Sequence, residues 1–174
     1  MSYSRNFGFR STANVVRDGR CKSPAASTWK IGEPVTLNPS APGELKQAVA
    51  GAATAGAGLA IFEHIQKPGV DPNLTVPLDF DWIPAKAYVQ SVHGIGVKVW
   101  FKNTASKTLY DGRTVAAGGL LASSVVLSGL AIGAQLTPDG SGKFKVANGT
   151  TDGNWLTVAS VNTTTGVVEA TLNF

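Results

Sequence analysis

The sequence IGEPVT at Ile31–Thr36 returns as IGAQLT at Ile132–Thr137, and this repeat decides the fold. The first copy continues through a Pro- and Ser-containing turn to GELKQA at 43–48, and the second continues through PDGS to GKFKVA at 142–147. Each copy then reaches an apolar segment after a turn of small residues. An internal repeat constrains the architecture before any single motif does. We predict that each copy is a β-hairpin and that the duplicated hairpin forms the centre of the fold.

Short alternating segments predict further strands around the hairpins. Residues 86–92 and 95–102 flank His93-Gly94, which has the composition of a hairpin turn. The closing segments 154–161 and 166–173 alternate cleanly around the polar turn between them. In residues 95–102, strand alternation turns Val97, Val99 and Phe101 inward. It turns Lys98, Trp100 and Lys102 outward. Short strands with frequent turns predict an all-β fold, either a small β-barrel or a sandwich.

The stretch from Thr114 to Pro138 contains no charged residue. A membrane-spanning helix needs about 20 predominantly apolar residues, and here glycines and serines interrupt the apolar positions. The pieces Val125–Leu127 and Leu130–Ile132 have the length of strands. We therefore expect buried strands in this stretch, and no membrane span.

The net charge of the protein lies at its N-terminus. Residues 1–28 hold five basic side chains and one acidic one, and residues 29–174 hold ten of each, so the net charge of +4 comes from the first segment. That segment is also rich in Ser, Asn and Gly and ends in a linker-like PAAS. We predict a basic, extended, weakly structured N-terminal arm at 1–28 and a single β-rich domain at 29–174. Deletion of the arm is expected to leave a folded body.

Three roles remain open for the arm. It can lie on an acidic protein surface, bind nucleic acid through phosphates, or be a solvated terminus. The aromatic residues among its arginines favour a protein surface, so nucleic acid is not the expected partner. Trp100 is a further candidate contact, because an exposed Trp often anchors an interface, although this face of the strand could instead be covered. The candidate contact residues are Arg5, Phe7, Phe9, Arg10, Arg17, Arg20 and Trp100.

The sequence offers little for catalysis. His64 and His93 are its only histidines, and the lone Cys21 cannot form an internal disulfide or a Cys-based zinc site. Asp79 and Asp81 could share a strand face as a glycosidase pair or a calcium site, but the prolines around them favour exposed loop acids. We expect no enzymatic activity, no cofactor and no metal.

A series of short phrases runs through residues 29–36, 43–48 and 58–62, and it continues at 88–94 and at the second Ile-Gly phrase, 132–137. This series resembles the capsid decoration (cement) proteins of tailed bacteriophages. It implies a virion structural protein on the capsid exterior that binds the major capsid protein and stabilises the expanded shell. It also implies a homo-oligomer, with a trimer favoured. The alternatives are a phage tail or head-completion protein, a carbohydrate-binding adhesion module with an exposed Trp as platform, and an enzyme that uses Asp79 and Asp81.

Overall fold

The structure, a computed structural model, describes residues 7–10, 16–22, 29–61, 82–83, 88–102, 107–108, 114–115 and 119–174. It is an all-β sandwich of two antiparallel sheets, and neither sheet closes into a barrel within these residues. The helical part of the described chain is one short 3₁₀ turn, η1 (Leu127–Gly129). The predicted all-β class is confirmed, and the sandwich is the form it takes.

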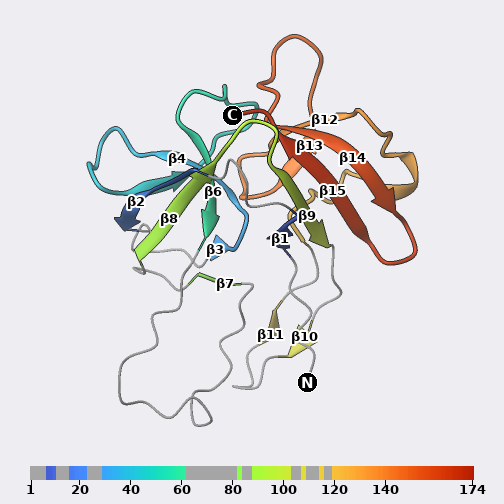
Figure 1. The fold of residues 1–174 in the computed structure, drawn as a ribbon, viewed down its shortest axis with the longest axis horizontal. Coiled ribbons are helices and arrows are strands. Elements are labelled where there is room, and N and C mark those ends of the chain that lie inside the picture. The colour runs from blue at the N-terminus through green and yellow to red at the C-terminus, as the bar shows by residue number, and fades with distance from the viewer. Residues whose placement is uncertain are drawn as a thin grey trace.

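Eleven strands build the two sheets (Figure 1). Sheet A has the order β1 (Phe7–Phe9), β9 (Lys98–Lys102), β15 (Val167–Leu172), β14 (Leu156–Asn162), β12 (Gln135–Pro138), β13 (Phe144–Val146). Sheet B has the order β2 (Val16–Lys22), β8 (Tyr88–His93), β6 (Ala57–Ile61), β4 (Pro34–Leu37), β5 (Leu45–Gln47). Two small pairs join β3 (Trp29–Lys30) to β7 (Trp82–Ile83), and β10 (Lys107–Thr108) to β11 (Thr114–Val115).

The predicted hairpins are confirmed, as β4–β5 and β12–β13. In the first, Thr36 pairs with Lys46, and in the second Thr137 pairs with Lys145. Their turns end at Gly43 and Gly142, whose φ angles of 81° and 80° lie in the left-handed region that favours glycine. The backbone hydrogen bonds beside the hairpins also correspond. Gly32 N–H donates to Ala60 O (2.7 Å), and in the second copy Gly133 N–H donates to Val158 O (2.8 Å). Likewise Ala48 N–H donates to Pro34 O (3.0 Å), and Ala147 N–H donates to Gln135 O (2.8 Å).

The duplication extends well beyond the hairpins. We call the unit of β2, β4, β5, β6 and β8 repeat 1, and the unit of β9, β12, β13, β14 and β15 repeat 2. In each repeat the strands, numbered along the chain, lie in the sheet in the order first, fifth, fourth, second, third. β1 is the extra strand, added to sheet A beside β9. Apart from β1, the two sheets are therefore two copies of one five-stranded unit.

The buried side chains form two clusters. The smaller one packs Trp29 of β3 against repeat 1, and its other members are Val35, Leu45, Ala60 and Val89. The larger one is shared by both sheets. In it, four side chains of sheet B pack against the inward side chains of sheet A. The four are Ala57, Leu59, Ile61 and Val92. Sheet B is therefore covered by apolar contacts on both of its faces.

The residues around His93-Gly94 do not form the predicted hairpin. β8 belongs to sheet B and β9 to sheet A, so the segment between them crosses from one sheet to the other, as Figure 1 shows at the top. The crossing is fixed to the end of the chain, because Gly94 N–H donates to Phe174 O (2.8 Å) and Gly96 N–H donates to Leu172 O (2.9 Å). The turn-like composition marks the junction of the two repeats, which sequence periodicity cannot distinguish from a hairpin.

The uncharged stretch also differs from expectation. The predicted pieces Val125–Leu127 and Leu130–Ile132 lie within residues 119–134, which consist of turns, η1 and an isolated bridge at Leu121, so neither piece is a strand. The end of the stretch does form a largely buried strand, β12. Val126 and Ile132 are 66% and 74% exposed, whereas Leu120 and Leu130 reach the core. The glycines and serines between the apolar residues let single side chains turn inward without a continuous strand. Among the described residues, no helix is long and apolar enough to cross a membrane.

Parts of the predicted arm are strands of the sheets. Residues 7–9 form β1 on β9, and residues 16–22 form β2 on β8. The expectation of a weakly structured arm is therefore wrong for these two pieces, because β9 and β8 pair with their backbones and make them the edge strands of the two sheets. A division of the chain at residue 28 stays a prediction.

Candidate interaction surface

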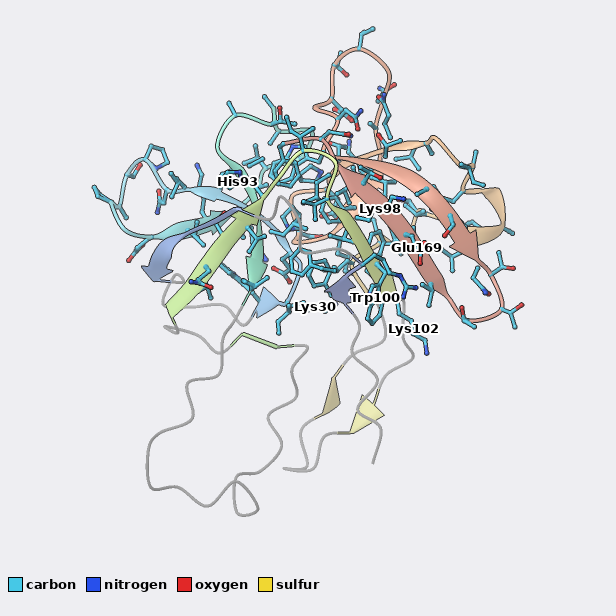
Figure 2. The ribbon with its side chains drawn as sticks, in the orientation of Figure 1. Lys30, His93, Lys98, Trp100, Lys102 and Glu169 are labelled. Carbon is cyan, nitrogen blue, oxygen red and sulfur yellow. The ribbon has the colours of Figure 1, made fainter. Side chains whose placement is uncertain are left out.

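The outward face of β9 carries the candidate surface. Val99 and Phe101 are buried to 0% and 1% exposure, so this strand is fixed in the core from its inner side. Lys98 is exposed on the outer side, and Trp100 and Lys102 are half-buried there. This alternation is the one that the sequence predicted. Figure 2 shows the three outward side chains with Glu169 on the neighbouring strand β15.

Trp100 packs across the backbone of β1. Gly8 is its register partner on that strand, and Glu169 is its partner on β15. A Cβ atom at Gly8 would lie 2.7 Å from Trp100 Nε1 and 2.9 Å from Cε2, closer than real contacts allow. The absence of a side chain at Gly8 therefore makes room for the indole. Trp100 helps to hold β1 in place and is half-buried for this reason.

Arg10 completes the arrangement at the end of β1. Its guanidinium lies 2.6 Å from Glu169 Oε1, and its Cζ atom lies 5.8 Å from the centre of the Trp100 ring. Its backbone N–H donates to Lys98 O at 2.8 Å. The Arg10 side chain is about half exposed, so the ion pair is worth about 0.2–1 kcal/mol. We call the five side chains on this face the outer patch; they are Arg10, Lys98, Trp100, Lys102 and Glu169.

The phenylalanines of β1 have a different role from the one predicted. Phe7 is 7% exposed and belongs to the shared core, and Phe9 packs against the same core. Their rings meet edge to face, with centroids 5.4 Å apart. Alternation along the strand puts both rings on the inner face, and Gly8 and Arg10 on the outer face. Phe7 is therefore a core residue and is not placed to contact a partner.

Two of the other predicted contact residues lie in the other sheet. Arg17 and Arg20 are on β2 in sheet B, where their backbones pair with Val92 and Gln90. Arg5 lies outside the described residues, as do His64, Asp79 and Asp81. No group of three or more His, Cys, Asp or Glu side chains that could hold a metal ion occurs in the part of the chain that the structure describes.

The sequence reasoning missed two members of this region. Glu169 was one position in the alternating closing segment 166–173, with no face assigned to it. Gly8 was part of the predicted weakly structured arm and was not singled out. A single glycine between two phenylalanines, with an Arg after them, is a usable signal: the glycine leaves room for a large side chain on the neighbouring strand.

A second polar cluster joins the two repeats. Glu33 is 5% exposed, and its two carboxylate oxygens accept from Lys30 N–H (2.9 Å) and from Gln47 Nε2 (3.0 Å). It also lies against Gly142 in the turn of the second hairpin, where a Cβ atom would be 2.6 Å from Glu33 Oε2. Burial raises the pKa of Glu33 from 4.5 to about 7. This cluster connects the two repeats and is not open to a ligand.

Lys30 belongs to the same junction. Burial is the main cause that lowers its pKa, and the charge of Lys143 lowers it further. The Lys30 ammonium group lies 3.4 Å from Gly119 O, so it is directed towards repeat 2. The charges around Glu33 therefore come from both repeats, with Lys30 on the side of repeat 1 and Asp139 and Lys143 on that of repeat 2.

Comparison with known protein families, curated proteins and solved structures gives no match for this chain. What the fold and the outer patch suggest about function therefore depends on the residues of this chain alone.

Proposed function

We propose that this chain is a virion structural protein that binds the outer surface of a phage capsid and stabilises the expanded shell. Its partner would be the major capsid protein, and it would act as a homo-oligomer, with a trimer favoured. The proposed location is the capsid exterior. The sequence support is the resemblance to decoration proteins at residues 29–36, 43–48, 58–62, 88–94 and 132–137.

The structural observation that carries the proposal is the outer patch on a rigid sheet. Lys98, Trp100 and Lys102 stand on one strand whose inner side chains are fully buried. Contact residues that are already fixed lose little entropy on binding. Trp and Arg are enriched in protein-binding surfaces, and the patch holds Trp100 beside Arg10. A shell presents many identical sites, so weak contacts by each subunit of an oligomer add up.

The stabilising action follows from preferential binding. A protein that binds the expanded shell and not its precursor lowers the free energy of the expanded form. The stabilisation grows with the ratio of the free protein concentration to its Kd for the expanded shell. It needs no chemistry at the site. A duplicated sandwich whose two sheets share one buried core suits this role.

The experiment is co-sedimentation of the purified protein with undecorated phage heads, expanded in one sample and unexpanded in the other. We expect saturable binding to the expanded heads, a fixed ratio of protein to capsid subunit, and delayed release of DNA on heating. Analytical ultracentrifugation of the free protein tests the trimer. Equal binding to both forms, or none to either by a folded protein, would contradict the proposal.

A further inference from the structure

Two lysines of the outer patch have no carboxylate partner among the residues that the structure describes. Arg10 is paired with Glu169 at 2.6 Å. No carboxylate of the described residues lies within ion-pair distance of Lys98 or Lys102. Within the outer patch, the positive charge available to a partner therefore lies on β9, at the two sides of Trp100.

The spacing of these groups is fixed by strand geometry. Lys98 and Lys102 are four residues apart on one face of a strand, so their Cα atoms are separated by about 13 Å. Trp100 lies midway between them. An extended chain that places side chains on one face has the same repeat, with alternate residues on that face about 7 Å apart.

We propose that the outer patch binds an extended acidic segment of the partner protein, with carboxylates four positions apart and an apolar side chain midway. The two carboxylates pair with Lys98 and Lys102, and the apolar side chain covers the exposed part of Trp100. This inference rests on the proposed function in one respect, which is that the segment belongs to the capsid protein. The chemistry of recognition stands without it.

The patch favours a polypeptide over a nucleic acid. Within the outer patch, Arg10 is already paired with Glu169, which leaves Lys98 and Lys102 for phosphates. Two lysines offer little for the counterion release that supplies most of nonspecific nucleic-acid affinity. Two carboxylates at the same spacing as the lysines match them without further basic contacts.

The experiment is a titration followed by NMR, with the full chain and short synthetic peptides of Gly, Ser and Thr. One peptide has two glutamates four positions apart with a leucine midway. A second has the same composition with the glutamates adjacent, and a third has lysines in place of the glutamates. We expect shifts of the Trp100 indole N–H signal with the first peptide and at least about tenfold weaker binding with the second and third. An oligothymidylate is titrated in parallel.

Variants separate the patch from general charge. Lys98→Glu combined with Lys102→Glu reverses the charge of the patch, and the signal of Trp100 reports whether the fold is kept. Lys46→Glu, on β5 of sheet B, is the matched control. We expect the double variant to lose at least about tenfold in affinity for the first peptide and the control to bind normally.

Equal binding of the two glutamate peptides, or unchanged binding by the double variant, overturns the inference. Tighter binding of the oligothymidylate than of every peptide also overturns it, in favour of a nucleic-acid surface. The same variants with expanded heads separate the two proposals. Head binding that survives charge reversal refutes the patch and leaves decoration standing, whereas peptide binding by a protein that does not bind heads refutes decoration alone.

Discussion

Replacement of Glu33 by Gln is expected to stabilise the protein at high pH and to leave it nearly unchanged at low pH. Glu33 is 5% exposed between the two repeats, and burial raises its pKa from 4.5 to about 7. The folded state therefore holds a proton on this carboxyl group at pH values where the unfolded chain has lost it. The contribution to stability is complete below about pH 4.5 and is lost as the pH rises through 7.

The size of the effect follows from the shift. A rise of about 2.5 pKa units, at about 1.4 kcal/mol each, corresponds to about 3 kcal/mol. We therefore expect Glu33→Gln to exceed the parent protein in unfolding free energy by up to about 3 kcal/mol at pH 8 and by little at pH 4. The amide can keep both hydrogen bonds, because a flip of the Gln47 amide presents an acceptor to the new NH₂ group.

The assay is urea unfolding followed by Trp fluorescence at a series of pH values between 4 and 8. Glu44→Gln is the matched control, because Glu44 lies in the turn of the same hairpin and is only half-buried. All other titrating groups are common to the proteins, so the difference between the curves isolates residue 33. Parallel stability curves for Glu33→Gln and the parent would refute the reasoning and place the Glu33 charge in a well-compensated site.

Three further perturbations test the packing. Gly8→Val places a Cβ atom against the Trp100 indole, which should lower the free energy of unfolding by about 1–3 kcal/mol and loosen β1. The measurements are the Tm, which should fall, and Trp fluorescence, which should change. Gly129→Val is the control, because a Cβ atom there lies in open space and should change the Tm little. Trp155→Phe removes the indole N–H that donates to Ala52 O at 2.7 Å and should cost at least about 1 kcal/mol in urea unfolding; an unchanged midpoint would show that water replaces this bond. Deletion of residues 1–28 removes β1 and β2 from the two sheets, so we expect a large loss of cooperativity in thermal unfolding, contrary to the expectation from sequence. Deletion of residues 1–6 is the control and should leave both strands and the Tm unchanged.

Local pattern predicted much of the fold. The repeated phrase identified both hairpins, and the alternation of residues 95–102 gave the facing of β9 correctly. The polar turn before β15 was also predicted, and Asn162 Oδ1 accepts there from the N–H groups of Thr164 and Thr165. In each of these cases the structure depends on residues close together in the chain, so a sequence window contains the information.

The errors come from contacts between distant segments. The crossing after His93 has the composition of a hairpin turn, and only the pairing of β9 with β15, far along the chain, determines that it changes sheet. The N-terminal segment was read as an arm because its charge is high, although Phe7 is buried and Gly8 has its register partner in Trp100. The outer patch was therefore half predicted. Arg10 and Trp100 were named as contacts, and Lys98 and Lys102 were predicted to face outward. Glu169, and the place of Gly8 against Trp100, become visible only when three strands are placed side by side.

The duplication explains why the outer patch lies where it does. The register gives Leu59 and Thr157 equivalent places in the two repeats, and it does the same for Val92 and Thr171. In repeat 1 this face is apolar and packs into the core shared with repeat 2. In repeat 2 the same face is half-exposed and polar, and it continues across β15 to β9 and the outer patch. One copy uses the face to join its neighbour within the chain. The other copy keeps it in solvent, which is the arrangement that a contact with a separate partner requires.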